Sequence, residues 1–227
     1  MQTDNSRTAA PFTGADFYGV ASIFDEIWGW ELEGAAQAER ARLALFYTAA
    51  ALASGNWARV VREQPAAPVD DLDDAGRVLA FLCADIKGIE TPAYDRAGYA
   101  RLALFYRQAL EETAAGREIL DFYARIEAVN ADLLGQLRSR AMGWDAELKL
   151  LITAPAARGR GCAGMLTRAC FEDVRANRGR WCMLLTDTHC AWQYYEQTGW
   201  SQDARRPWGD DSGITGFAYR KDVGRRD

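Results

Sequence analysis

The sequence is poor in histidine and has no paired cysteines, and both features narrow the classes of function. His189 is the only histidine among 227 residues, and none of the five cysteines forms a CxxC pair. A zinc site needs closely spaced cysteine and histidine ligands, so this spacing disfavours one, and we expect no metal cofactor. The odd number of cysteines and their wide separation disfavour a disulfide framework and predict buried free thiols.

Long apolar runs and an excess of basic residues are also absent. No stretch approaches the ~18 consecutive apolar residues that cross a bilayer, so we expect no membrane partner. Residues 1–14 lack the basic and apolar regions of a secretory signal. We expect them to form a flexible tail, and the location to be cytoplasmic by default. The net charge of −5 disfavours nucleic acid as a partner.

One segment departs from this acidic average. Residues 156–180 contain six arginines and two acidic residues, hence a local net charge of +4. Such an excess suits an anionic ligand, although a solvated helix face would have the same composition.

The first part of the chain predicts helices and one hairpin. Apolar residues recur at helical spacing, which predicts helices over residues 15–33, 36–53 and 92–140, the last with a break near Gly116. Strand-forming residues flank a polar, proline-containing loop, which predicts paired strands over residues 56–63 and 77–86.

The last third alternates between strand and helix. Predicted strands cover residues 146–153, 181–187 and 213–222, and predicted helices cover residues 162–177 and 191–199. Because a strand–helix–strand succession makes a parallel pair with a crossover, we expect an α/β fold.

A glycine-rich stretch with two arginines, ITAPAARGRGCAG, spans residues 152–164 at a strand-to-helix junction. Gly159, Gly161 and Gly164 fit GxGxxG, and Asp187 follows 23 residues later, where a dinucleotide-binding fold has its ribose-binding acid. Only 40 residues follow Asp187, too few for the rest of a doubly wound sheet. An NAD-dependent oxidoreductase is therefore the less favoured interpretation.

A phosphate site at the start of a helix is the second interpretation of the same stretch. A helix N-terminus has unpaired N–H groups and a positive dipole end, and glycines let the backbone approach a pyrophosphate. Arg158-Gly159-Arg160-Gly161-Cys162-Ala163 resembles the R/Q-x-x-G-x-G/A signature of the GCN5-related N-acetyltransferases, the GNAT family. About 30 residues later, YYEQTGW at residues 194–200 resembles that family's YYEKxGF box.

This resemblance implies a GNAT-type mixed α/β fold, in which helices flank a central twisted sheet. It implies acetyl-CoA as co-substrate and a small-molecule or peptide primary amine as acceptor, and it is compatible with a homodimer. Residues 15–227 would form a single acetyltransferase domain, with the acceptor side in residues 15–144 and the acetyl-CoA-binding core in residues 145–227. The helical segment at 92–140 is longer than the family's usual single helix.

The resemblance also implies roles for individual residues. Tyr195 would be the general acid that protonates the leaving thiolate, which suits a group with a reference pKa of ~10. Residues near the thioester and pantetheine would be Leu150, Leu151 and Ile152. Residues at the pyrophosphate would be Arg158, Gly159, Arg160, Gly161, Cys162, Ala163 and Gly164.

The proton acceptor for the attacking amine has several candidates. Glu147 is the first, because several family members have a carboxylate early on this strand; the alternatives are Asp85, Asp187, His189 and water. Ala191 stands where the family often has an asparagine that contacts the pantetheine arm. A catalytically weak acetyl-CoA-binding module is therefore another alternative. The acidic loop after residue 63 and the aromatics Trp28, Trp30 and Trp57 suggest a cationic or apolar amine as acceptor.

Overall fold

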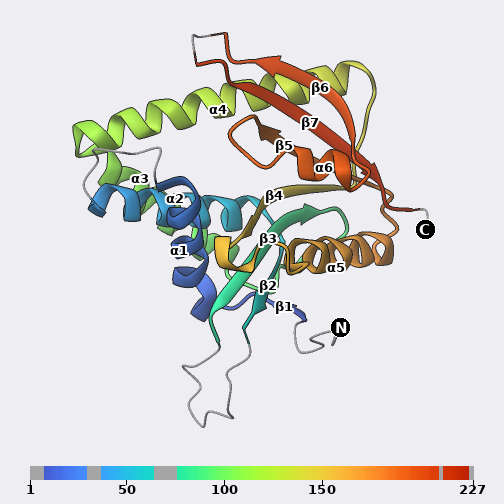
Figure 1. Ribbon diagram of the computed structural model, residues 1–227, viewed down its shortest axis with the longest axis horizontal. Coiled ribbons are helices and arrows are strands. Elements are labelled where there is room, and N and C mark those ends of the chain that lie inside the picture. Colours follow the sequence, from blue (N-terminus) through green and yellow to red (C-terminus); the bar gives the residue numbers. More distant parts are fainter. Residues whose placement is uncertain (1–7, 30–36, 64–75, 210–211, 225–227) are drawn as a thin grey trace.

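The computed structural model describes residues 8–29, 37–63, 76–209 and 212–224 (Figure 1). The strands are β1 (Ala9–Pro11), β2 (Trp57–Arg62), β3 (Val78–Ile86), β4 (Ala146–Thr153), β5 (Trp181–Asp187), β6 (Ser201–Pro207) and β7 (Thr215–Asp222). The helices are α1 (Phe17–Trp28), α2 (Gln37–Ser54), α3 (Arg96–Glu111), α4 (Ala114–Ser139), α5 (Cys162–Ala176) and α6 (Gln193–Gln197).

These strands form one seven-stranded mixed sheet in the order β1-β2-β3-β4-β5-β7-β6. The β4–β5 pair is parallel and is connected through α5, whereas the other neighbouring pairs are antiparallel. The predicted α/β fold, the hairpin and the parallel crossover pair are confirmed. A doubly wound sheet would need a run of parallel strands, so the dinucleotide-binding interpretation loses its structural basis.

Two strands at the sheet edges were missed by the sequence analysis. Ala9–Pro11 pairs with β2, so the prediction of a flexible tail is wrong for these residues, while residues 1–7 lie outside the described part. The other missed strand is β6, in which most side chains are exposed because it lies at the edge of the sheet. Its sequence SQDARRP therefore lacks the alternation of apolar and polar residues by which strands are recognised.

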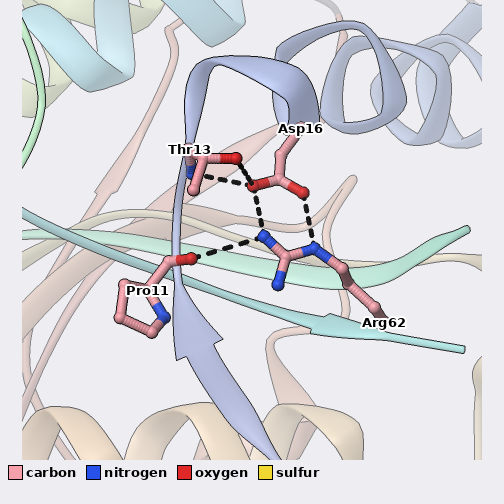
Figure 2. Close-up of polar contacts among 4 residues, drawn as sticks. All are labelled: Pro11, Thr13, Asp16 and Arg62. Carbon is pink, nitrogen blue, oxygen red and sulfur yellow. Dashed lines mark hydrogen bonds and ion pairs between the residues drawn. The ribbon is translucent and has the colours of Figure 1, made fainter. Parts of the chain in front are cut away.

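A buried carboxylate joins the beginning of α1 to the sheet (Figure 2). The Asp16 side chain is 1% exposed, and it accepts hydrogen bonds from Arg62 Nε at 2.8 Å and Arg62 Nη2 at 2.6 Å. The backbone N–H and the hydroxyl of Thr13 donate to the same carboxylate at 2.8 and 2.9 Å. Arg62 Nη2 also donates to the carbonyl of Pro11. The bidentate ion pair therefore fixes β1 and α1 against β2.

Helices cover both faces of the sheet. α5 packs against β2, β3 and β4, and α1 and α2 pack against β3 and β4. Successive β3 side chains point to opposite faces, and all but one of them are buried, so neither face is open to solvent there. The resulting core joins residues from both halves of the chain, from Phe12 to Val223.

The predicted helical segment at 92–140 consists of two helices. The break lies at residues 112–113, just before Gly116, and Thr113 caps α4 by accepting the Gly116 N–H at 3.0 Å. A side chain at Gly116 would collide with the carbonyl of Leu110, which explains the glycine. α4 lies along β6 and β7 (Figure 1) and buries Val129, Leu133 and Leu137 there.

Candidate active site

The parallel strands β4 and β5 diverge, and this divergence creates the site. They pair only from Ala146 to Leu148 on β4, although both strands continue beyond that point. On its other edge β4 has a bulge, because Cys83 faces Leu150 and Ala84 faces Leu148, which leaves Lys149 as the extra residue. A bulge bends its strand and increases the local twist, so it accounts for the separation of β4 from β5.

A cleft of about 2100 Å³ occupies this gap. Its central walls are formed by residues 147–153 of β4 and 184–187 of β5. The start of α5 closes one end, which we call the donor end. At the other end, which we call the acceptor end, the cleft is lined by residues of α1, α2 and α4.

The donor end has the geometry of an anion site. Gly159 and Gly161 have φ angles of +74° and +77°, a left-handed conformation that favours glycine, and a Cβ at either position would meet open space. The first backbone hydrogen bond of α5 runs from Met165 N–H to the Gly161 carbonyl. The N–H groups of Cys162, Ala163 and Gly164 precede it and point out of the helix end. This arrangement can hold a pyrophosphate.

The arginines of this stretch lie in different surroundings. Arg158 is exposed and lines the cleft. Arg160 does not line it, and its Nη1 lies 3.9 Å from a Glu63 carboxylate oxygen. The other donor-end residues suggested by the resemblance all line the cleft: Leu150, Leu151, Ile152, Gly159, Gly161, Cys162, Ala163 and Gly164.

Tyr195 lies on the short helix α6 and lines the cleft. Its ring centroid is 5.8 Å from that of Trp200 and 5.9 Å from that of Tyr219, so aromatic packing holds the ring in place. Burial raises the pKa of Tyr195 well above its usual value, which keeps the hydroxyl protonated. Tyr194, interpreted from sequence as a core residue, is half-buried and also lines the cleft.

Among the candidate proton acceptors, Glu147, Asp187 and His189 line the cleft, and Asp85 does not. The carboxylate of Glu147 forms an ion pair with Lys149 at 2.7 Å. That contact already occupies one of its carboxylate oxygens.

Asp187 ends β5 and lies inside the cleft. Burial raises the pKa of its carboxyl group, while the His189 N–H, which donates to Oδ1 at 2.8 Å, and interactions with Cys190 partly offset this effect. A carboxylate with a raised pKa accepts protons more readily than an exposed one, so Asp187 suits a general base.

The acceptor end contains a group of aromatic residues, most of which the sequence analysis did not identify. Their rings are contributed by α1, α2, α4 and the segment after β6: Phe24, Trp28, Tyr47, Phe122, Tyr123 and Trp208. Trp28 was among the aromatics suggested from sequence. Trp57 is buried at the other side of the sheet, where its Nε1 donates to Asp173 at 2.6 Å. Trp30 and the acidic loop lie outside the described residues.

All five cysteines lie in the described part of the chain and none forms a disulfide, and Cys83, Cys162, Cys170 and Cys182 are buried as predicted. Burial raises the pKa of the thiols of Cys83 and Cys182 to about 12, so they are inert. Within the described residues, no cluster of three or more metal-binding side chains is found. None of the described helices has the length and apolar character needed to span a bilayer.

The sequence matches no protein-family model and no curated protein sequence, but its structure resembles solved structures. The histone acetyltransferase HPA2 and related acetyltransferase from Corynebacterium glutamicum has a TM-score of 0.53 and 18% identity, over 96% of each chain. The ribosomal-protein-S18-alanine N-acetyltransferase from Escherichia coli has a TM-score of 0.51 and 10% identity, over 97% of this chain and 96% of its own. A GNAT-family protein from Desulfovibrio desulfuricans has a TM-score of 0.50 and 15% identity, over 96% and 98%.

These similarities define the class of fold. The chain has the fold of the GCN5-related N-acetyltransferases, as its two sequence motifs suggested. At identities of 10% to 18%, the shared property is the fold.

Proposed function

We propose that this protein is an acetyl-CoA-dependent N-acetyltransferase that transfers an acetyl group to a primary amine. The observation that carries the proposal is the cleft between β4 and β5, which opens next to the glycine-lined start of α5. In this proposal residues 15–227 act as one domain. Residues 145–227 hold the donor and residues 15–144 shape the acceptor side.

We propose one orientation for acetyl-CoA in the cleft, with its pyrophosphate at the start of α5 and its thioester between β4 and β5. Its pyrophosphate would accept hydrogen bonds from the N–H groups at the start of α5, and the Arg158 guanidinium would add charge. Its pantetheine arm would then extend along Leu150, Leu151 and Ile152, with the thioester near the bulge at Lys149. A backbone N–H of β4 that faces the gap would stabilise the oxyanion.

The reaction needs three proton transfers. The ammonium of the acceptor first gives a proton to a base, for which we propose Asp187 rather than the ion-paired Glu147. The neutral nitrogen then attacks the thioester carbonyl, the C–N bond forms, and the C–S bond breaks as the tetrahedral intermediate collapses. The nitrogen loses its second proton to solvent, and Tyr195 protonates the departing thiolate. Tyr195 then regains a proton from solvent and Asp187 releases its own, so the products are an N-acetyl amide, CoA and one proton.

Thermal unfolding with acetyl-CoA, CoA or NAD tests donor binding. A ligand that binds only the folded state raises the midpoint, by about 2.7 kcal/mol of stability at 100 times its dissociation constant. We expect a rise with acetyl-CoA and CoA and none with NAD. No rise with either CoA species at millimolar concentration would refute the proposal.

Acetyl transfer is then measured as acetylated amine by chromatography, because Cys190 is only half-buried and could interfere with thiol reagents. Tight CoA binding without transfer to any amine would favour the binding-module alternative, in which Ala191 lines a cleft that retains its donor but lacks turnover.

A further inference from the structure

The acceptor end of the cleft carries enough chemistry to define a class of amine. Four of its rings form a connected chain across three helices. Phe24 is 4.7 Å from Trp28 and 4.7 Å from Tyr47 between ring centroids, and Tyr47 is 5.1 Å from Tyr123. We call these four residues the aromatic wall. A second contact, Phe122 to Trp208 at 5.2 Å, lies in the same lining.

The aromatic wall reaches the site of the proposed chemistry. Burial raises the pKa of the Tyr47 hydroxyl, and Tyr123, Cys190, Glu127 and Asp187 add to this shift. Both Tyr47 and Asp187 line the cleft, and Tyr195 borders it beside Cys190. Because both residues line the same cleft, a ring held against Tyr47 could extend a short side arm toward Asp187.

The charges at this end suit a single cation. α4 contributes Glu118 and Glu127, but it also contributes Arg125 and Arg138, so its charges offset one another. Arg125 lies over the Phe122 ring at 5.7 Å. Asp187 is the half-buried carboxylate that lines the cleft at the end of β5. A polyamine or an aminoglycoside would need several carboxylates without nearby arginines.

We propose, resting on the acetyltransferase function above, that the acceptor is an arylalkyl monoamine: one primary amine on a short arm attached to an aromatic body. The ring would pack against the aromatic wall, and the ammonium would meet Asp187. Offset and edge-to-face packing, together with attraction between the ammonium and the ring faces, favours such a molecule over an aliphatic amine of the same size.

The first experiment compares acceptors on the unaltered protein. The matched series is 2-phenylethylamine, 2-cyclohexylethylamine, n-hexylamine, spermidine and a short peptide with a free N-terminus. We expect kcat/KM for 2-phenylethylamine to exceed that for every other member by about tenfold or more. Equal or better use of spermidine, an alkylamine or the peptide overturns the inference and leaves the acetyltransferase function standing.

Binding to the CoA-loaded protein, measured by titration calorimetry with the same amines, separates the two proposals. If no amine is acetylated, the acetyltransferase function fails, and the order of binding affinities still decides the preference for an aromatic body. Tightest binding of 2-phenylethylamine supports the inference, and a flat order overturns it.

Two leucine substitutions on α1 form a matched pair. Trp28→Leu removes a ring of the aromatic wall, whereas Tyr18→Leu removes a ring that is 70% exposed and outside the cleft lining. We expect Trp28→Leu to lower kcat/KM for 2-phenylethylamine about tenfold and that for n-hexylamine much less, with CoA affinity unchanged. Tyr18→Leu should change none of them. Equal loss for both amines in Trp28→Leu contradicts a specific role of the ring.

Discussion

The two ends of the cleft are built from different parts of the chain and from different groups. The donor end uses backbone: the N–H groups at the start of α5 and two glycines with positive φ, all within residues 158–164. The acceptor end uses side chains from α1, α2, α4 and the segment after β6, which are far apart in sequence.

This difference teaches what each end can tolerate. A backbone site depends on conformation, so it accepts few residue types at its glycines and binds one invariant ligand. A side-chain site can change its lining without changing the fold, so it can be adapted to one acceptor. The following variants test whether the two ends behave independently.

Replacement of Asp16 should cause the largest loss in the free energy of unfolding. Asp16 supports the acceptor end because it holds α1 against β2. Asp16→Ala leaves Arg62 without its buried partner, and breaking such a pair costs about 3–5 kcal/mol. Urea unfolding should show this loss, while the dissociation constant of CoA for the remaining folded protein stays unchanged.

The matched control for Asp16, which caps the start of α1, is an aspartate within that helix. Asp25 pairs with Arg40 at 3.2 Å, but both side chains are about one-third exposed, so Asp25→Ala should cost about 1 kcal/mol or less. Similar losses in both variants would show that the pair in Figure 2 is no more important than a surface pair.

Tyr195 lines the cleft from α6 and belongs to neither end as defined above. Tyr195→Phe removes the proposed general acid, and we expect kcat to fall about 100-fold with CoA affinity unchanged. Tyr194→Phe is the control, because its ring also lines the cleft. An unchanged kcat with 2-phenylethylamine in Tyr195→Phe would remove this residue from the acid role.

Variants of Arg158 and Arg160 distinguish a direct contact at the donor end from a general effect of nearby positive charge. Arg158→Ala should weaken CoA binding about tenfold, or about 1.4 kcal/mol, by losing a charge-assisted phosphate contact at an exposed position. Arg160→Ala should leave the affinity unchanged, since Arg160 lies outside the cleft lining. Calorimetric titration with CoA measures both, and equal weakening would mean that only local charge matters.

The smallest expected effect is a change in how the melting temperature depends on pH when Asp187 is replaced. Its folded-state pKa is raised by burial, so the ionised form is disfavoured in the fold, and this cost is present above the folded pKa. Asp187→Asn should therefore raise the melting temperature slightly at pH 7–8, and the gain should vanish as the pH falls through the usual carboxyl range. A gain that does not change with pH would exclude this cause.

The same variant also tests the proton acceptor. Asp187→Asn should lower kcat more than Glu147→Gln does. The opposite order would return this role to Glu147, which was the first candidate in the sequence.

The donor end could be predicted from sequence because its determinants are local. Gly159, Gly161 and the following helix are consecutive, so the sequence predicted a glycine-rich strand-to-helix junction, and its role in phosphate binding stays a prediction. The bulge at Lys149 left no such signal, because it depends on the register of β4 against β3. The aromatic wall was hidden for a similar reason: Phe24 and Tyr123 have the helical spacing of ordinary core residues. Only the packing of α1, α2 and α4 brings their rings together.

The divergence of β4 and β5 also creates an edge inside the sheet. Beyond Leu148, the backbone groups of β4 that face the gap have no strand partner among the described residues. An outer edge can be protected by proline and charge, as at the end of β6 with Arg205, Arg206 and Pro207, but this inner edge must stay open to be used. An extended molecule lying there completes the hydrogen bonding of the sheet, so amide hydrogen exchange along β4 should slow when the gap is filled. The gap thus offers one further strand position in the sheet, and a ligand that fills it acts as a structural element.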